Sequence, residues 1–227
     1  MNKTQCILLV VFILKMCLTN NLVMGQVERW EEQLKQDPEN EKILLNLGKY
    51  YHDRSGNQKH KQAVKKAEEY LTQLLHIDST HGLALVYYGS LLTMKARDAS
   101  LPWNKLKYVK KGIARMDKAV YFEPDNPEVR LIRGINSVSL PSRFNRLPCG
   151  LEDFEHIQQI HKKHPLDLTG NFWLSYYFNY GLALWKAENY TQAREKFSNA
   201  IEIDPDSDYA AAAREYVEKI EEKTGEK

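Results

Sequence analysis

Four arginines and one aspartate in the middle of the chain have the side chains best suited to electrostatic chemistry. Arg130, Arg133, Arg143 and Arg146 precede Asp153 within 24 residues. Guanidinium groups bind carboxylates and phosphates through paired N–H donors, so the four arginines could form a pocket for such an anion. Alternatively, Arg130 or Arg133 could pair with Asp153 inside the fold, an arrangement that adds little net stability but is costly to break. The sequence allows both interpretations.

Patterns typical of catalytic or metal sites are weak elsewhere. His161 and His164 have no acidic or cysteine companion at ligand spacing, which argues against a metal site. Cys149 and His156 would lie two turns apart on one helix, too far for a nucleophile and its base. No phosphate-loop, dinucleotide, zinc-protease or serine-hydrolase motif occurs. We expect no metal, no cofactor and no enzymatic activity; an enzyme site near the arginine-rich segment is the weaker alternative.

A repeat of 40 to 45 residues organises most of the chain. Junctions that end helical segments recur at Pro38, Ser79, Pro124, Pro165 and Pro205. Ten residues after each of the first three junctions comes a glycine: Gly48, Gly89 and Gly134. The partner segments carry small and large residues in turn, as in Ala193, Phe197 and Ala200. Small residues let two antiparallel helices approach closely, and proline ends the pair.

This pattern resembles the tetratricopeptide repeat (TPR) family. The match is strongest in residues 174–207, at Tyr177, Tyr180, Gly181, Leu184, Ala193, Phe197, Ala200 and Pro205. The resemblance covers about residues 41–207 as four units and implies an all-α fold, a right-handed α-solenoid of helix-turn-helix units. The first three units are elongated, and we expect their extra residues at the turn inside each unit.

Segments outside the units complete the predicted domain organisation. Residues 26–40 should form a leading helix, and the solenoid should occupy 41–227 with a C-terminal capping helix from about 207. Leu166–Asn171 looks like an insertion between the third and fourth units.

The resemblance also implies a concave groove for a peptide or helix, lined by the first helix of each unit. The positions that match the family's groove lining are Lys42, Leu45, Lys49, Leu83, Val86, Leu131, Ile135, Val138, Phe178, Leu182 and Trp185. This lining is basic in the first unit and mostly apolar afterwards, which suits an amphipathic helix or hydrophobic peptide with an acidic end. Alternatively, the leading helix and the long loops cover these residues as ordinary core.

The first 25 residues have the layout of an export signal. Lys3 precedes the apolar run Ile7–Leu14, and Gly25 supplies a small residue at the expected cleavage point. We expect an extracytoplasmic protein, secreted or periplasmic. The alternative is an uncleaved N-terminal anchor, which would make the protein a membrane-tethered assembly factor.

Charge and cysteine counts narrow the class of partner. After residue 25 the chain carries 30 basic and 30 acidic residues, so it has no overall field for nucleic acid or anionic lipid, although a local patch could exist. Only Cys149 remains in that part, which excludes an intramolecular disulfide framework there. The sequence therefore predicts an interaction scaffold with a protein or peptide partner, no nucleic acid, and membrane contact only through an uncleaved leader.

Overall fold

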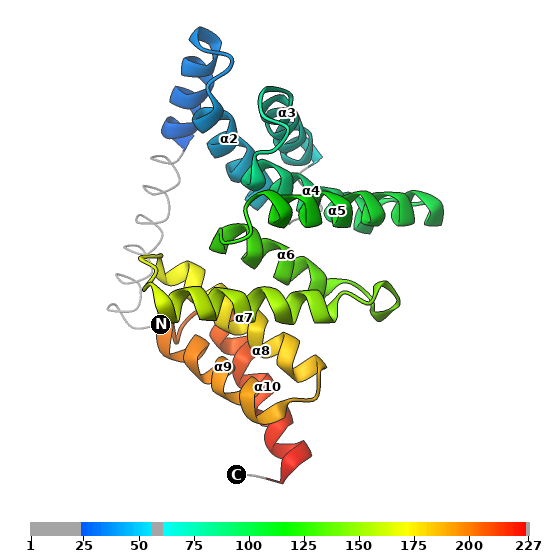
Figure 1. Cartoon of the computed structure of the whole chain (residues 1–227), viewed down its shortest axis with the longest axis vertical. Helices are drawn as coiled ribbons and strands as arrows, with labels where there is room; N and C mark the ends of the chain where they lie inside the picture. The colour runs from blue at the N-terminus through cyan, green and yellow to red at the C-terminus, as the bar shows by residue number, and fades with distance from the viewer. Residues whose placement is uncertain (1–23, 56–60, 226–227) are drawn as a thin grey trace, which may run out of the picture. The chain divides into compact units, whose positions relative to one another are not determined.

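The computed structural model describes residues 24–55 and 61–225, and every regular element in these ranges is helical (Figure 1). The predicted all-α fold class is thus confirmed. The chain divides into two compact units: unit 1 extends to Ser79, and unit 2 begins at Thr80. The predicted export signal falls at 1–25, and its residues 1–23 lie outside the described ranges.

Unit 1 contains a leading helical segment and one helical hairpin: residues 24–36, then α2 (Glu41–Arg54) and α3 (Lys61–Ile77). The described part of unit 2 contains three hairpins, a 3-10 turn and a terminal helix: α4 (Gly82–Asp98), α5 (Pro102–Phe122), α6 (Pro127–Ser139), η1 (Ser142–Phe144), α7 (Leu147–Lys163), α8 (Gly170–Lys186), α9 (Tyr190–Ile203) and α10 (Asp208–Thr224).

In unit 1, α2 and α3 pack through the glycine that the repeat pattern singles out. A Cβ atom added to Gly48 would lie 2.6 Å from a methyl carbon of Leu71, so the glycine makes room for the buried leucine. Asn40 begins α2, because its side-chain oxygen accepts a hydrogen bond from the backbone N–H of Ile43 at 3.1 Å. The first predicted helix pair therefore forms with the expected contact.

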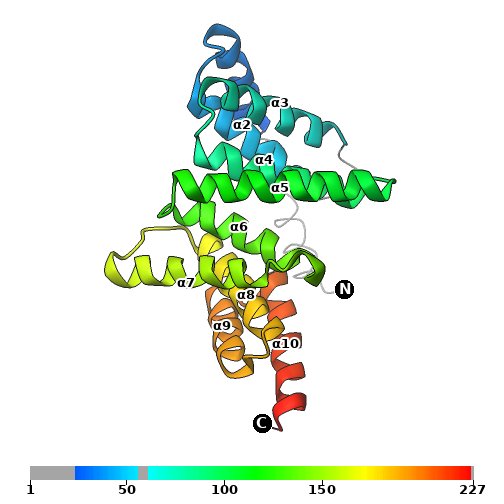
Figure 2. The same ribbon diagram turned by 45° about the vertical axis from the view of Figure 1, so that its right-hand side comes forward.

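In unit 2, helices that follow each other in the chain pack as pairs: α4 with α5, α6 with α7, and α8 with α9. Each pair also packs on the next, since α6 contacts both α4 and α5, and α8 contacts both α6 and α7. The terminal helix α10 packs on α9 and α8. Figure 2 shows the succession of helices from α4 to α10. This stacking of hairpins is the architecture of an α-solenoid.

The closest approach of two helices within a pair occurs between α4 and α5. A Cβ atom on Gly89 would lie 2.8 Å from the carbonyl oxygen of Gly112, and one on Gly112 would lie 2.7 Å from that of Gly89. Both neighbouring atoms belong to the backbone, so only glycine allows this crossing. The pair α8–α9 uses a glycine against a ring instead, with Phe197 2.8 Å from a Cβ placed on Gly181.

The extra residues of the second unit of the repeat do not form the loop expected from the sequence. They lengthen both helices, so that α4 has 17 residues, α5 has 21, and only residues 99–101 join them. In the third unit the extra residues do form a connection between α6 and α7. This connection contains η1, and η1 is followed by Asn145 with a φ of 49°. The insertion predicted at 166–171 is irregular until Thr169, whose side chain caps α8.

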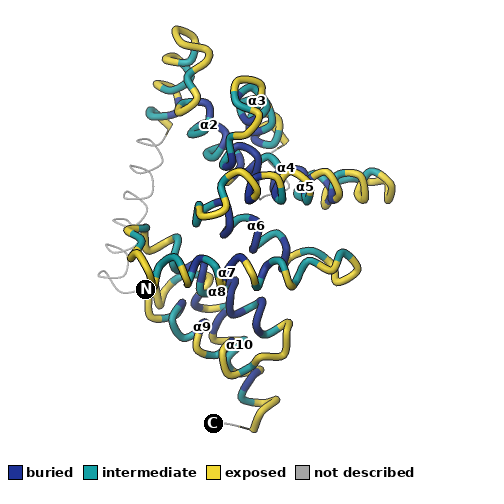
Figure 3. The backbone as a smooth tube through the Cα atoms, in the orientation of Figure 1, coloured by how far each residue is buried: buried dark blue, intermediate teal, exposed yellow. Residues whose placement is uncertain are grey.

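The largest described core cluster lies in the C-terminal half of unit 2. Phe154, Tyr176, Tyr180 and Phe197 are buried there, and Phe154 stacks on Tyr180 with ring centroids 5.5 Å apart. Figure 3 shows the buried positions on the sides of the helices that face their neighbours. The hydrophobic face of each helix is thus used for stacking.

Candidate functional site

The arginine-rich segment forms a buried ion-pair network around Asp153. This aspartate lies on α7 and has no exposed surface. Arg133 on α6 donates from Nε to Oδ2 at 2.8 Å and from Nη2 to Oδ1 at 2.7 Å. Arg130 donates from Nη1 to Oδ1 at 3.0 Å. The internal pair is therefore the correct one of the two interpretations of Arg130, Arg133 and Asp153.

The position of Asp153 follows from the repeat. It occupies the place of a small residue opposite the glycine of the first helix, and a Cβ on Gly134 would lie 3.4 Å from the Cβ of Asp153. Burial raises the pKa of the Asp153 carboxyl, and the hydrogen bonds and charges of Arg133 and Arg130 oppose that rise. For Arg133, burial alone would lower the pKa, but the bond to Asp153 raises it, so the guanidinium stays charged.

A second aspartate extends the network to the preceding hairpin. Asp117 on α5 accepts hydrogen bonds from both terminal nitrogens of Arg146, one of them from Nη1 at 3.1 Å. It also accepts one from Nη1 of Arg133 at 3.3 Å. Arg133 therefore bridges Asp117 and Asp153, and the network joins α5 to α6, α7 and the loop that precedes α7.

These contacts overturn the predicted anion pocket. The guanidinium groups of Arg130, Arg133 and Arg146 already bind carboxylates of the same chain, and Glu152 lies 3.5 Å from Arg130 as a further acid. Arg143 is exposed, and its guanidinium lies over the ring of Phe144, 5.2 Å from the centroid. Acids of the chain itself thus engage three of the four arginines of the predicted pocket.

The predicted groove positions of unit 2 differ in burial. Val86, Leu131 and Val138 are buried, so they offer no surface to a ligand and belong to the core. The remaining predicted positions of unit 2 are half-buried: Leu83, Ile135, Phe178, Leu182 and Trp185. Part of the predicted groove is therefore buried in the core of the fold.

Polar bonds between α4, α6 and α8 fix how these helices lie side by side. The hydroxyl of Tyr87 donates to Glu128 at 2.6 Å, and that of Thr93 donates to the side-chain oxygen of Asn136 at 2.7 Å. Further along, Nζ of Lys186 donates to the backbone oxygen of Val138 at 2.7 Å. These bonds hold α4 beside α6 and α6 beside α8.

Comparison with known proteins identifies the fold. No protein-family model and no curated protein matches the sequence. Among solved structures, the chain is similar to TTC0263, a thermophilic TPR protein in Thermus thermophilus, with a TM-score of 0.63 and 13% identity over 88% of this chain and 94% of that one. The chain has the TPR fold. It is also similar to MamA, with a TM-score of 0.50 and 20% identity over 82% of this chain and 91% of that one.

At the C-terminal end of the TPR array, α10 covers part of the predicted groove. Phe178 packs against Tyr209, with ring centroids 4.9 Å apart, and Trp185 packs edge-on against Tyr216 at 5.1 Å. Phe178 also contacts the ring of Phe197, so its side chain is a contact between α8, α9 and α10. Because both of these aromatic side chains pack against α10, we name the other three half-buried positions the A-helix face: Leu83, Ile135 and Leu182.

The predicted groove positions of unit 1 all lie on α2. Lys42 is exposed, and Leu45 and Lys49 are half-buried. Glu31, in the leading segment, accepts hydrogen bonds from Lys66 at 2.6 Å and from the hydroxyl of Tyr51 at 2.9 Å. The leading segment is thus bonded to both helices of the α2–α3 hairpin.

The same polar cluster shifts the pKa values of its members. Tyr70 also donates to Glu31, at 3.1 Å, and burial raises the pKa of this tyrosine to about 12. Burial alone would raise the pKa of Glu31, but the bonds from Lys66, Tyr51 and Tyr70 together lower it. An open cavity of about 400 Å³ lies beside the cluster, lined in part by Leu34 and Gln73.

The remaining candidates for chemistry lie apart in the TPR fold. Cys149 and His156 both belong to α7, seven residues apart as the sequence indicated, and His156 lies 2.7 Å from Asp125. The ring of His161 packs against that of Trp173 at a tilt of 56°, and its Nδ1 accepts a hydrogen bond from the backbone N–H of Leu166. Within residues 24–55 and 61–225, no group of three metal-ligating side chains comes together, and no helix is both long and apolar enough to cross a bilayer.

Proposed function

We propose that the protein is a non-enzymatic scaffold that binds an apolar peptide or an amphipathic helix on the A-helix face. The observation that carries this proposal is the partial exposure of Leu83, Ile135 and Leu182 on three consecutive first helices. Such a row gives apolar anchor points to an extended or helical segment. The TPR fold supports the same class of function in general terms.

The arginine-rich network supports a scaffold over an enzyme. Its guanidinium groups are held by Asp117 and Asp153, so they act between helices of the chain. We propose that the network fixes the stacking of α5, α6 and α7 and thereby the spacing of the A-helix face. A ligand segment would then meet a surface of fixed register.

We also propose that the scaffold acts outside the cytoplasm after cleavage near Gly25. The apolar run and the small residue at the cleavage point support this localisation. The alternative is a membrane-tethered assembly factor with the leader retained. Intact mass and N-terminal sequencing of the protein from its natural source separate the two, because cleavage removes about 25 residues.

Photo-crosslinking tests the A-helix face without breaking the fold. A benzoylphenylalanine is placed at Leu83 or at Leu182, and the matched control places it at Tyr121 on α5, an aromatic position that is 79% exposed. We expect a crosslinked partner from the two A-helix positions that is missing from the control, and loss of the crosslink with excess partner peptide. The same partner profile from all three positions would contradict the proposed surface.

A further inference from the structure

The solvent side of α5 is strongly basic in a chain that is otherwise balanced. The helix carries six cationic side chains, all exposed: Lys105, Lys107, Lys110, Lys111, Arg115 and Lys118. Its one acid, Asp117, binds Arg146 and Arg133. Because the basic and acidic residues after position 25 are equal in number, the remainder of that part of the chain carries an excess of acid. Outside α5, unit 2 carries 15 basic and 19 acidic residues, so its excess of positive charge lies on this one helix.

Large apolar side chains accompany these cations. Leu101, Trp103 and Leu106 are 43%, 65% and 45% exposed at the beginning of α5. At the other end of the helix, Tyr121 is 79% exposed. The lengthening of α4 and α5 produces this arrangement, since it carries the tip of the hairpin into solvent (Figure 3).

Helical spacing places the key residues in one row. Trp103, Lys107, Lys110 and Tyr121 follow each other at 4, 3 and 11 residues, which keeps them on one side of an α-helix. The opposite side is buried against the fold through Val109 and Met116. The row therefore runs along the outside of a helix about 30 Å long, with an aromatic residue near each end.

We propose that this outer row of α5 docks on an anionic lipid bilayer surface. Lysines attract anionic headgroups, and their aliphatic stems let apolar surface sit against the bilayer while the ammonium groups stay in water. Tryptophan and tyrosine occupy the headgroup level, and exposed leucine beside them enters the acyl boundary. Leu106, 45% exposed beside the row, favours lipid over a nucleic acid, because phosphodiester strands offer no apolar phase for aliphatic side chains.

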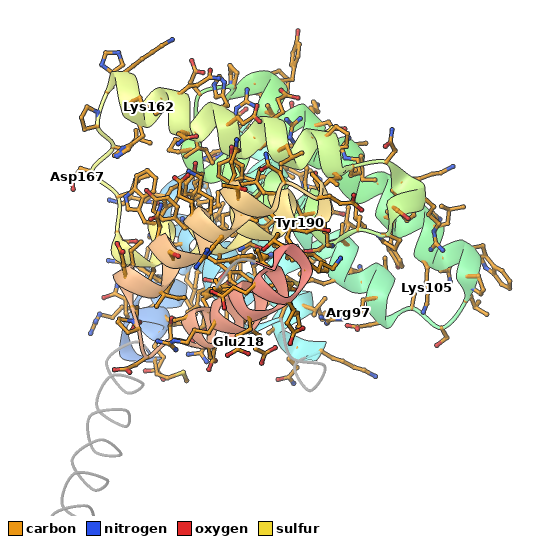
Figure 4. All side chains as sticks on the ribbon, turned by 90° about the horizontal axis from the view of Figure 1, so that it is seen from below. Arg97, Lys105, Lys162, Asp167, Tyr190 and Glu218 are labelled. Carbon is orange, nitrogen blue, oxygen red and sulfur yellow. The ribbon has the colours of Figure 1, made fainter. Side chains whose placement is uncertain are left out.

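Such docking would give the protein membrane contact through its folded part, whereas the sequence suggested contact only through the leader. The proposal is independent of the A-helix face, because α5 is the second helix of its hairpin and contributes no residue to that face. Figure 4 shows Lys105 and Arg97 at one end of unit 2, on the opposite side from Lys162. Lys162 and Lys163 on α7 are also exposed and provide a matched pair of control cations.

The experiment measures co-sedimentation of the full chain with vesicles of phosphatidylcholine, with or without 30% phosphatidylglycerol. Each variant keeps the same N-terminus, so residues 1–25 contribute equally. We expect Lys107→Gln/Lys110→Gln to lower the affinity for anionic vesicles about 30-fold, from about fivefold per cation. The control Lys162→Gln/Lys163→Gln should change it less than twofold, and Trp103→Ser should lower it on the order of tenfold.

Tryptophan quenching by brominated lipid reports whether α5 itself reaches the bilayer. We expect anionic brominated vesicles to quench part of the emission, and Trp103→Phe to remove that part. Equal loss of affinity in both double-lysine variants, or quenching unaffected by Trp103→Phe, would overturn the proposal. Binding of a nucleic-acid duplex or an acidic peptide through the same lysines, without binding of anionic vesicles, would overturn it in favour of that other partner.

Discussion

Removing the carboxylate of Asp153 should destabilise the protein more than removing any exposed charge. Asp153 is fully buried and receives three hydrogen bonds from Arg130 and Arg133. In Asp153→Ala the two guanidinium groups stay buried without that partner, which costs about 3–5 kcal/mol. Glu152 lies 3.5 Å from Arg130 and is 65% exposed, so it can turn inward and compensate in part. We therefore expect about 3 kcal/mol, at the lower end of this range.

Two comparison variants make the result specific. Asp117→Ala removes a carboxylate that is 40% exposed, and solvent screening reduces its expected cost to about 1 kcal/mol. Burial raises the pKa of Asp153, so holding its charge is itself costly. The apolar triple variant Arg130→Met/Arg133→Leu/Asp153→Leu should therefore recover most of the stability lost in Asp153→Ala.

Urea unfolding at low and high salt measures these differences. Emission of Trp173 and Trp185 reports on α8, which packs on α6 and α7 of the network. We expect the loss in Asp153→Ala to be independent of salt, whereas the small loss in Asp117→Ala should shrink as salt screens it. A loss below about 1 kcal/mol in Asp153→Ala, or a triple variant no more stable than Asp153→Ala, would refute the assignment of a buried charge network.

Three further predictions concern backbone contacts and the polar cluster of unit 1. Gly89→Ala should destabilise unit 2 by about 1–3 kcal/mol because its Cβ meets the backbone of Gly112, whereas Gly170→Ala, with only a methyl carbon of Ile203 3.9 Å away, should change it by less than about 0.5 kcal/mol in the same urea titration. Glu188 has a φ of 61°, so Glu188→Gly should raise the melting temperature through relief of about 1 kcal/mol of strain. The lowered pKa of Glu31 stabilises the folded state above about pH 4.5, and this stabilisation is lost as pH falls through the folded pKa; the raised pKa of Tyr70, about 12, gives stability that is lost as pH rises between about 10 and 12. Melting temperatures of unit 1 measured against pH should fall in both pH ranges, and Glu31→Gln should abolish the fall at acidic pH.

Several features of the fold could be predicted because they depend on local sequence. The repeat of glycine and small residues located the contacts between paired helices, and Gly48 with Leu71 forms as expected. The substitution of Asp153 for a small residue opposite Gly134 also pointed to its arginine partners. In each case, the two residues lie on the two helices of a single hairpin, so their spacing along the chain determines their contact.

Other features depend on packing between hairpins, and spacing alone does not reveal them. Asp117 binds Arg146, 29 residues later in the chain, although no repeat spacing relates the two residues. Phe178 matched a groove position, but the array ends with a helix whose Tyr209 and Tyr216 cover it.

Pro102 indicates in the sequence where α5 begins, although the length of the repeat unit led us to expect a loop there. The extra residues include strong helix formers such as Lys95 and Ala96, and they extend the helices where a loop was expected. Pro102 is favoured at the first position of a helix, which is where α5 begins. The proline therefore indicates a turn directly before it, and residues 99–101 form that turn.

Burial decides which of the chain's charges a partner can meet. Three of the four arginines in the densest arginine cluster of the sequence bind Asp117 or Asp153, so their charge is met between helices. The lysines of α5 are spread along the chain at ordinary spacing, yet all of them are exposed. If α5 holds lipid while the A-helix face holds a peptide, both surfaces of unit 2 can be occupied at once. Binding of anionic vesicles should then leave the crosslinks from Leu83 and Leu182 unchanged.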